Sequence, residues 1–190
     1  SLGSIYALIA LGYTMIYGII KLINFAHGDI YMLGAYIGYF CMTTLKLGFL
    51  PSLLIAMAGC TVLGFAIEKI AYKPLRNAPR IAVLITAIGV SLFLEYGTMF
   101  FVKANVRTYP AMTGLLAERY QLGGVVVTMQ QILILAITIL LMVVLQFIVK
   151  RTRIGRAMRA ASLDNDAAQL MGINVDTTIS FTFVLGSALA

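Results

Sequence analysis

Charged residues are scarce in this 190-residue chain: Asp, Glu, Lys and Arg make up only 11% of it, whereas hydrophobic residues make up 61%. A soluble globular domain carries roughly 25% charged residues. The mean hydropathy of +0.97 agrees with this imbalance. The composition therefore excludes an ordinary soluble domain and indicates a membrane protein.

Cysteine and histidine are also rare, with only Cys41, Cys60 and His27 present. Both cysteines lie within apolar runs, where thiols are usually buried and unreactive. The sequence has no Cys-x-x-Cys motif and no second histidine, so its pattern does not favour a metal site. We predict two free, buried thiols, and neither a metal ion nor a cofactor.

Recognisable enzymatic motifs are missing as well. The sequence contains no G-x-x-x-x-G-K-[ST] nucleotide-binding loop and no nucleophile–base motif. We therefore predict no catalytic residues and expect that the chain is not an enzyme by itself. If energy drives it, that energy comes from an ion gradient or from a separate subunit. The net charge of +7 does not indicate nucleic-acid binding, because the basic residues are spread over the ends of the apolar runs.

Long apolar runs dominate what is present. A bilayer crossing needs about 20 mostly apolar residues, and backbone groups in lipid find their hydrogen bonds only within helices or closed barrels. Runs of this length without alternation favour helices. We predict an all-α, polytopic transmembrane helical bundle of about six spans, in which residues 1–190 form a single domain that is a fragment truncated at both ends. The predicted spans are residues 4–20, 30–45, 51–67, 82–102 and 128–149, and a sixth that begins near Thr178 and is cut off at Ala190.

The distribution of Lys and Arg predicts the orientation, because basic residues gather on the cytoplasmic side of membrane proteins. Ten of the fourteen fall on one side of the predicted spans, within residues 21, 69–80 and 150–159. The other side has Lys46, Lys103, Arg107 and Arg119. We therefore expect residues 150–177 to be cytoplasmic and residues 103–127 to be extracytoplasmic.

A polar string, Asn24-Phe25-Ala26-His27-Gly28-Asp29, interrupts the apolar sequence between the first two spans. It is either a polar turn at the cytoplasmic interface or a break between helices close to a transport pathway, in which Gly28 permits a bend and Asp29 caps the next helix. Glu95, a lone acid within the 82–102 run, is either a contact for a substrate ammonium group or a structural hydrogen-bond partner. The predicted pathway residues are Asn24, Phe25, His27, Gly28, Asp29 and Glu95.

Gly34 and Gly38 follow this string with G-x-x-x-G spacing. Two glycines on one helix face allow the backbone of another helix to approach closely. We interpret the spacing as tight helix packing, with no specific partner assigned.

The polar segment 150–177 lies between two apolar runs and has the signals of a short helix. Ser162 is a candidate N-cap, Asp164 and Asp166 suit the first turns, and Gly172 is a candidate C-terminal stop. Leu163, Ala167, Leu170 and Met171 fall on one apolar face. One interpretation is a helix lying on lipid, but its polar face is acidic and anionic lipid repels it. A protein groove is the better binding partner.

Several motifs resemble LivH-type permeases of branched-chain amino acid ABC importers. The resemblance runs in order along the chain, through residues 4–12, 17–18, 23–29, 32–36, 71–76, 85–89 and 155–160. Within it, the string Asp166-Ala167-Ala168-x-x-x-Gly172 is similar to the E-A-A-x-x-x-G coupling helix that docks on the ATPase, with Asp in place of Glu and without the later Ile-x-Leu-Pro element. By resemblance, the residues for ATPase coupling are Arg156, Arg159, Ser162, Leu163, Asp166, Ala167, Ala168, Leu170, Met171 and Gly172.

The resemblance implies a permease subunit that imports leucine, isoleucine or valine across a bacterial or archaeal plasma membrane by alternating access. It also implies a second permease subunit (LivM-like, or a homologous copy), two cytoplasmic ATP-binding subunits and an extracytoplasmic substrate-binding protein. Permeases for urea and short-chain amides carry a similar string and are the alternative. An ion-gradient-driven transporter, with Asp29 and Glu95 as ion-binding acids, is a weaker hypothesis, because such a protein needs no ATPase-docking helix. A non-transporting membrane scaffold is also weaker, because it leaves the polar junction unexplained.

Overall fold

Each predicted apolar run forms a helix in the computed structural model, which describes residues 2–21, 23–76, 78–103, 105–110, 119–122 and 125–190. The all-α prediction is confirmed, and the helix bounds lie within a few residues of the predicted runs. The long helices are α1 (Leu2–Ile20), α2 (Ala26–Thr43), α3 (Phe49–Ile67), α4 (Arg80–Val102), α5 (Met129–Arg151) and α8 (Val175–Leu189).

Three helical segments within the described ranges have the length and apolarity of a membrane crossing: Phe49–Leu75, Ile81–Val102 and Met129–Arg151. A helix of 23 residues, such as α5, is about 35 Å long and exceeds a hydrocarbon core of about 30 Å. Gly3–Ile19 and Val175–Leu189 are apolar but shorter. The structure therefore supports a helical membrane protein, and the count of about six spans stays a prediction.

Shorter elements connect the long helices. The end of α3 continues into a π-helix, η1 (Glu68–Tyr72), and a 3₁₀ turn, η2 (Lys73–Leu75). Two short helices, α6 (Arg153–Leu163) and α7 (Asn165–Leu170), join α5 to α8. Ahead of α5, the strands β1 (Arg119–Leu122) and β2 (Val125–Thr128) form a small antiparallel hairpin that the sequence patterns did not predict.

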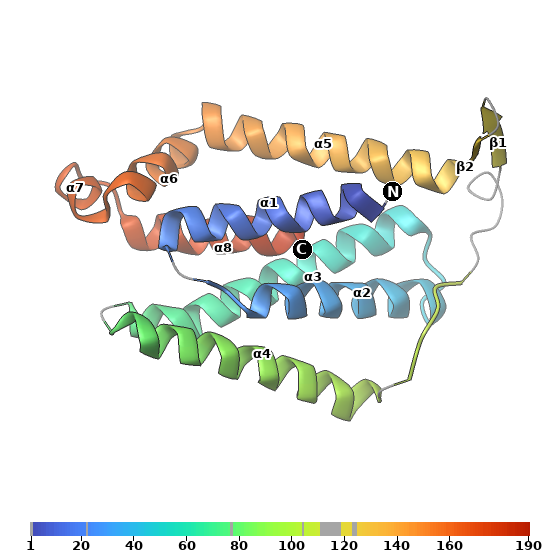
Figure 1. The fold of residues 1–190 in the computed structure, drawn as a ribbon, viewed down its shortest axis with the longest axis horizontal. Helices are drawn as coiled ribbons and strands as arrows, with labels where there is room; N and C mark the ends of the chain where they lie inside the picture. Colours follow the sequence, from blue (N-terminus) through green and yellow to red (C-terminus); the bar gives the residue numbers. More distant parts are fainter. Residues whose placement is uncertain (1, 22, 77, 104, 111–118, 123–124) are drawn as a thin grey trace.

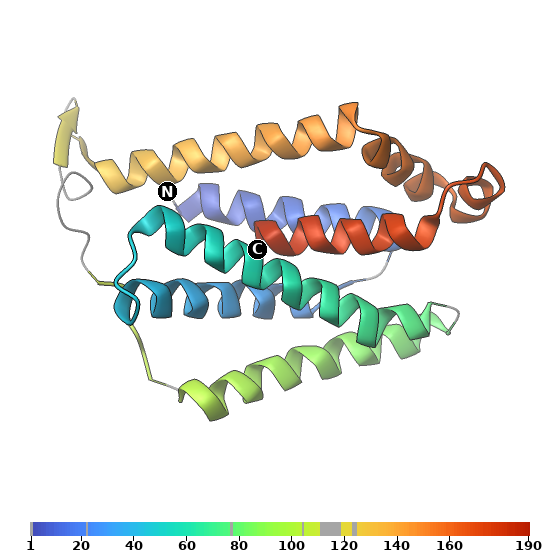
Figure 2. The same ribbon diagram turned by 180° about the vertical axis from the view of Figure 1, so that it is seen from behind.

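The bundle places α4 and α5 on its two flanks, with α1, α2, α3 and α8 between them (Figures 1 and 2). Helix α2 packs on α3, and α8 packs on both α1 and α3. Cys41 and Cys60 are buried and free, as predicted. The core joins side chains from most of the helices, among them Ile16, Ile30, Cys60, Val83, Met158 and Phe183.

The connections between the helices lie at two opposite ends of the bundle. The described residues 21 and 23–25, the η1–η2 segment (68–75) and the α6–α7 pair lie at one end, and the β1–β2 pair lies at the other (Figure 1). The first end carries the ten basic residues of the sequence pattern, and we call it the basic end. The alternation expected from the apolar runs is therefore present in the fold.

Close helix packing depends on glycines at the crossings. A Cβ atom at Gly34 would lie 2.6 Å from the sulfur of Cys60 on α3, which confirms the packing role read from the G-x-x-x-G spacing. At the crossing of α3 and α8, a Cβ atom at Gly64 would lie 1.9 Å from Ser187 Oγ and 2.4 Å from its Cβ. Both distances are shorter than any van der Waals contact, so the two helices approach this closely only because residue 64 has no side chain.

We expect Gly64→Ala to lower the free energy of unfolding by about 1–3 kcal/mol, the usual cost of overpacking a tight core. Thermal melting of the detergent-purified protein measures the change. Gly89→Ala is the matched control, because no atom lies within 4 Å of a Cβ at Gly89 on α4. A second substitution, Ser187→Gly, should restore the melting temperature of Gly64→Ala. Equal melting of Gly64→Ala and the parent protein would contradict this account of the crossing.

Candidate functional site

The junction between α1 and α2 is a buried polar cluster at the basic end. Asn24 and His27 are only 3% and 2% exposed. The Nε2 atom of His27 lies 3.2 Å from the carbonyl oxygen of Ile9 on α1, which ties the start of α2 to α1. The hydroxyl of Tyr72 donates to Asn24 Oδ1 over 2.8 Å, which ties the junction to η1. Asn24 and His27 thus hold the junction against two neighbouring elements.

The other residues of the string lie differently. Phe25 and Gly28 are exposed and Asp29 is half-buried. The chain bends at Lys21, whose φ is 56°, and not at Gly28, which lies inside α2. Asp29 does not cap α2: it is the fourth helical residue, past the free N–H groups, and its carboxylate accepts a hydrogen bond from Ser91 on α4.

Glu95 is exposed on α4, one turn beyond Ser91. Both ion pairs among the described residues involve Arg76, so Glu95 has no ionic partner within this part of the chain. Residues four apart lie on one helix face. The Asp29–Ser91 pair and Glu95 therefore line the same side of α4, on the flank of the bundle.

The sequence patterns did not predict a buried ionic network that lies at the basic end. Glu68 is 1% exposed, and its carboxylate pairs with Arg76 and accepts a 2.8 Å hydrogen bond from Ser180 Oγ on α8. Arg76 also pairs with Asp176, in the first turn of α8. An acid at the end of an apolar run, beside Lys69, looks like an interfacial residue in the sequence. Only the packing of α8 shows that Glu68 is buried.

The start of α6 packs closely against the end of α5. Thr152 ends α5 and caps α6: its Oγ1 donates to the Ile148 carbonyl (2.6 Å) and accepts from the Gly155 N–H (3.0 Å). A Cβ atom at Gly155 would lie 2.2 Å from the Ile148 carbonyl oxygen. The guanidinium of Arg159 donates to the Val149 carbonyl. Helix α6 is thereby fixed to α5.

The predicted single helix with Ser162 as its N-cap is wrong. Ser162 lies within α6, and its Oγ donates to the Arg159 carbonyl. Helix α6 continues through Leu163 because Met158 and Ala161 are buried against the bundle. Asp164 is the N-cap of α7, and its Oδ1 accepts from the N–H groups of Asp166 (2.9 Å) and Ala167 (3.1 Å).

The C-terminal stop at Gly172 is confirmed. Gly172 has φ of +81°, a conformation that glycine adopts at no steric cost. Its N–H bonds the Gln169 carbonyl (2.9 Å) and the Ile173 N–H bonds the Ala168 carbonyl (3.0 Å), which is the Schellman pattern. Asn174 then caps α8 through the Thr177 N–H (3.0 Å). The link from α7 to α8 is therefore short and hydrogen-bonded throughout.

The apolar residues assigned to one helix face are instead shared between α6 and α7, and they are solvent-exposed. Leu163, Leu170 and Met171 are 82%, 89% and 83% exposed. Ala168 is buried and packs with Ile173 in the core, so it anchors α7. Large apolar side chains presented on a well-capped loop typically mark an interaction site. The basic side chains of Arg156 and Arg159 are exposed nearby.

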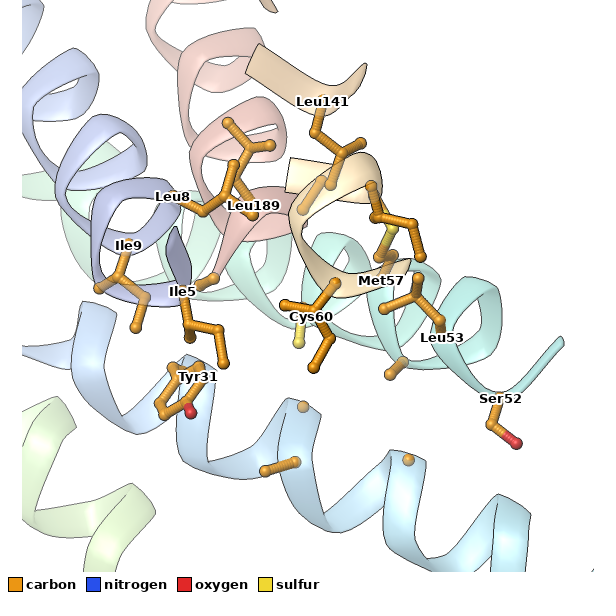
Figure 3. A pocket seen from close by; sticks show the side chains of 18 of the residues that line it. Ile5, Leu8, Ile9, Tyr31, Ser52, Leu53, Met57, Cys60, Leu141 and Leu189 are labelled. Atoms are coloured by element: carbon orange, nitrogen blue, oxygen red, sulfur yellow. The ribbon is translucent and has the colours of Figure 1, made fainter. Parts of the chain in front are cut away.

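A cavity of about 310 Å³ lies between α1, α2, α3, α5 and α8 (Figure 3). Its described lining contains no charged side chain. Three of its polar groups already bond the backbone: Ser52 to the Gly48 carbonyl, Thr138 to the Ile134 carbonyl and Tyr109 to the Ala35 carbonyl. The cavity suits a hydrocarbon group and has no group that would neutralise an ammonium or a carboxylate.

The segment before the hairpin covers the end of α2 opposite to the basic end. The hydroxyl of Tyr109 donates to the Ala35 carbonyl over 2.6 Å, and the Arg107 guanidinium lies 5.6 Å from the centres of the Tyr39 and Phe40 rings. Burial, and secondarily Tyr31, raise the pKa of the Tyr109 phenol, so it remains a hydrogen-bond donor. Within the described ranges, no three His, Cys, Asp or Glu side chains gather as a metal site.

Comparisons with known proteins identify the family of the chain. Residues 1–190 match the family described as branched-chain amino acid transport system, permease component. Over its full length the chain is 40% identical to the high-affinity branched-chain amino acid transport system permease protein BraD of Pseudomonas aeruginosa, and 39% identical to the corresponding LivH of Escherichia coli K12. A probable LivH of Methanocaldococcus jannaschii is 29% identical over 98% of the chain.

The chain spans 65% of the length of the first two relatives and 60% of the third. No solved structure matches it. The family match extends over all 190 residues, through the junction, the α6–α7 loop and α8. This chain belongs to the family of permease components of branched-chain amino acid transport systems.

Proposed function

We propose that the chain is a membrane-spanning permease subunit of an ATP-binding-cassette importer, and that it moves branched-chain amino acids by alternating access driven by a separate ATPase. The observation that carries the proposal is the α6–α7 loop, where three large apolar side chains, Leu163, Leu170 and Met171, project from a rigid and well-capped support. Family membership and the names of the relatives support the substrate class.

The α6–α7 loop is held at both ends, so a force applied to it would reach the long helices. Helix α6 is fixed to α5 through Thr152 and Gly155, and α7 is fixed to α8 through Gly172 and Asn174. A partner that binds Leu170 and Met171 and then moves would therefore move the ends of α5 and α8. It would not simply bend the loop. Two cytoplasmic ATP-binding subunits that close on ATP would supply this movement, with one such loop for each permease subunit.

We place the basic end in the cytoplasm, because ten of the fourteen Lys and Arg residues lie there. Residues 150–177 are then cytoplasmic, residues 103–127 face outward, and the bilayer is a bacterial or archaeal plasma membrane. An extracytoplasmic binding protein would deliver substrate to the hairpin end. The second permease subunit is a LivM-like protein or a homologous copy.

The proposed pathway lies on the flank of α2 and α4, which a second permease subunit would cover. Glu95 and the Asp29–Ser91 pair line one side of α4, and an acid facing lipid costs about 2.5–3.5 kcal/mol near the bilayer centre. A covering subunit removes that cost. Phe25 and Gly28 are exposed at the basic end of the same flank, whereas Asn24 and His27 support the junction from inside.

Replacing Leu170 and Met171 together by Asp should weaken ATPase binding by at least about tenfold, because exposed apolar anchors dominate interfaces of this kind. Co-purification of the ATPase subunits with the full-length permease measures the loss. Val106→Asp is the matched control: Val106 is 96% exposed but precedes the hairpin, at the other end of the molecule. If the double variant retained the ATPase at the parental ratio, the docking role would be wrong.

Uptake of labelled leucine by the complete transporter tests the substrate class. We expect an excess of unlabelled valine or isoleucine to suppress uptake, because an aliphatic side chain is common to all three. Urea and acetamide at the same excess should leave uptake unchanged. Competition by urea or acetamide, without competition by valine, would assign the chain to amide or urea transport instead.

A further inference from the structure

Helix α8 contacts the 68–76 segment at three successive positions of one face. Asp176 pairs with Arg76, Ser180 Oγ donates to Glu68 Oε2 over 2.8 Å, and the Phe183 ring lies 5.2 Å from the ring of Tyr72. Positions 176, 180 and 183 have the i, i+4, i+7 spacing of a single helix stripe. Since α7 leads into α8 through the Schellman turn at Gly172, this stripe is the first part of the bundle that follows the α6–α7 loop.

The same segment contacts the polar junction on its other side. The Tyr72 hydroxyl donates to Asn24 Oδ1 over 2.8 Å, and both residues are buried. Asn24 lies two residues before α2, and Asp29 within α2 accepts a hydrogen bond from Ser91 on α4. Separate contacts therefore link α8 to residues 68–76, residues 68–76 to Asn24, and Asp29 to α4, so the 68–76 segment lies between α8 and the junction.

The connecting element is a π-helical turn, Glu68–Tyr72. Such turns are rare and are frequently found at functional sites. A π turn holds one residue more than the α-helical pattern, so a change to α-helical hydrogen bonding would rotate the residues after it by about 100°. The α-helical alternative would give the turn a second discrete arrangement, which is the property that an element needs to carry coupling between distant sites.

We infer that the π turn Glu68–Tyr72, together with Arg76, is the relay that transmits movement of the α6–α7 loop to the Asn24–Asp29 junction. Glu68, Tyr72 and Arg76 are positioning residues in this assignment, and the inference rests on the proposed function. The buried Glu68 carboxylate keeps α8 and the turn together, because separating them would remove the Ser180 hydrogen bond and leave the charge with fewer partners.

Two mild variants test the relay in the complete transporter reconstituted in vesicles. Tyr72→Phe removes the hydroxyl that reaches Asn24 and keeps the ring against Phe183. Asp176→Asn removes the exposed end of the ionic network and leaves the Arg76–Glu68 pair in place. Each should raise the amount of ATP hydrolysed per leucine transported by about fivefold or more, the lower range of coupling effects. The double variant should show little further increase, because both changes interrupt one path.

The controls are Tyr6→Phe and Lys73→Gln. Tyr6 is exposed on α1, and Lys73 is an exposed charge beside Tyr72. Both should keep the parental ratio of ATP to leucine. A purely structural role for Tyr72 and Asp176 would lower hydrolysis and uptake in proportion, so an unchanged ratio in both variants would overturn the relay. Absence of ATP-driven leucine uptake in the parent transporter would instead refute the proposed function.

A spin label at Phe25→Cys provides a readout that does not need transport. Phe25 is exposed beside Asn24, whereas both native cysteines are buried. In the parent complex the label spectrum should change when ATP is added, and in Tyr72→Phe the change should be lost while ATPase binding persists. An equal ATP response in the parent and in Tyr72→Phe would also overturn the relay.

Discussion

Glu68 carries a carboxylate that is 1% exposed at the end of a membrane-length helix, and the basic end of the bundle is arranged around it. A buried charge is tolerated only when it is paired and hydrogen-bonded. Arg76 reaches it because the chain turns through η2, and Ser180 reaches it because α8 packs along η1. The position of α8 in turn sets that of α7, since only a capped turn separates them. The requirement to satisfy one acid thus orders four elements of the chain, η1, η2, α7 and α8.

The helices were predictable because lipid leaves a long apolar run few alternatives. The cap positions of the short helices were less predictable. Ser162, Asp164 and Asp166 are all acceptable N-cap residues, and local pattern does not choose among them. The choice is made by the burial of Met158 and Ala161, which extends α6 past Ser162 and leaves Asp164 to start α7. Gly172 was identifiable because a glycine after an apolar turn has few other roles.

The candidate site was likewise predictable only in part. Asn24 and His27 were conspicuous as polar residues in an apolar region, but the sequence could not show that the partner of Asn24 is Tyr72, forty-eight positions away. Glu95 was conspicuous for the same reason and proved to face outward. Glu68 was overlooked because it stands beside Lys69 at a span end. Contacts between distant segments, which composition and spacing do not encode, account for each of these outcomes.

The separation of apolar and polar surfaces bears on how a permease of this family selects its substrate. An amino acid brings an aliphatic side chain together with an ammonium and a carboxylate. The cavity among α1, α2, α3, α5 and α8 offers only apolar surface and hydroxyls that are largely committed to backbone carbonyls. The acids that could neutralise an ammonium, Asp29 and Glu95, lie on the flank of α4 instead. If the chain carries amino acids as proposed, recognition of the zwitterion would call for a surface that two permease subunits complete together. The proposed coupling loop and the proposed relay, in contrast, lie within one chain.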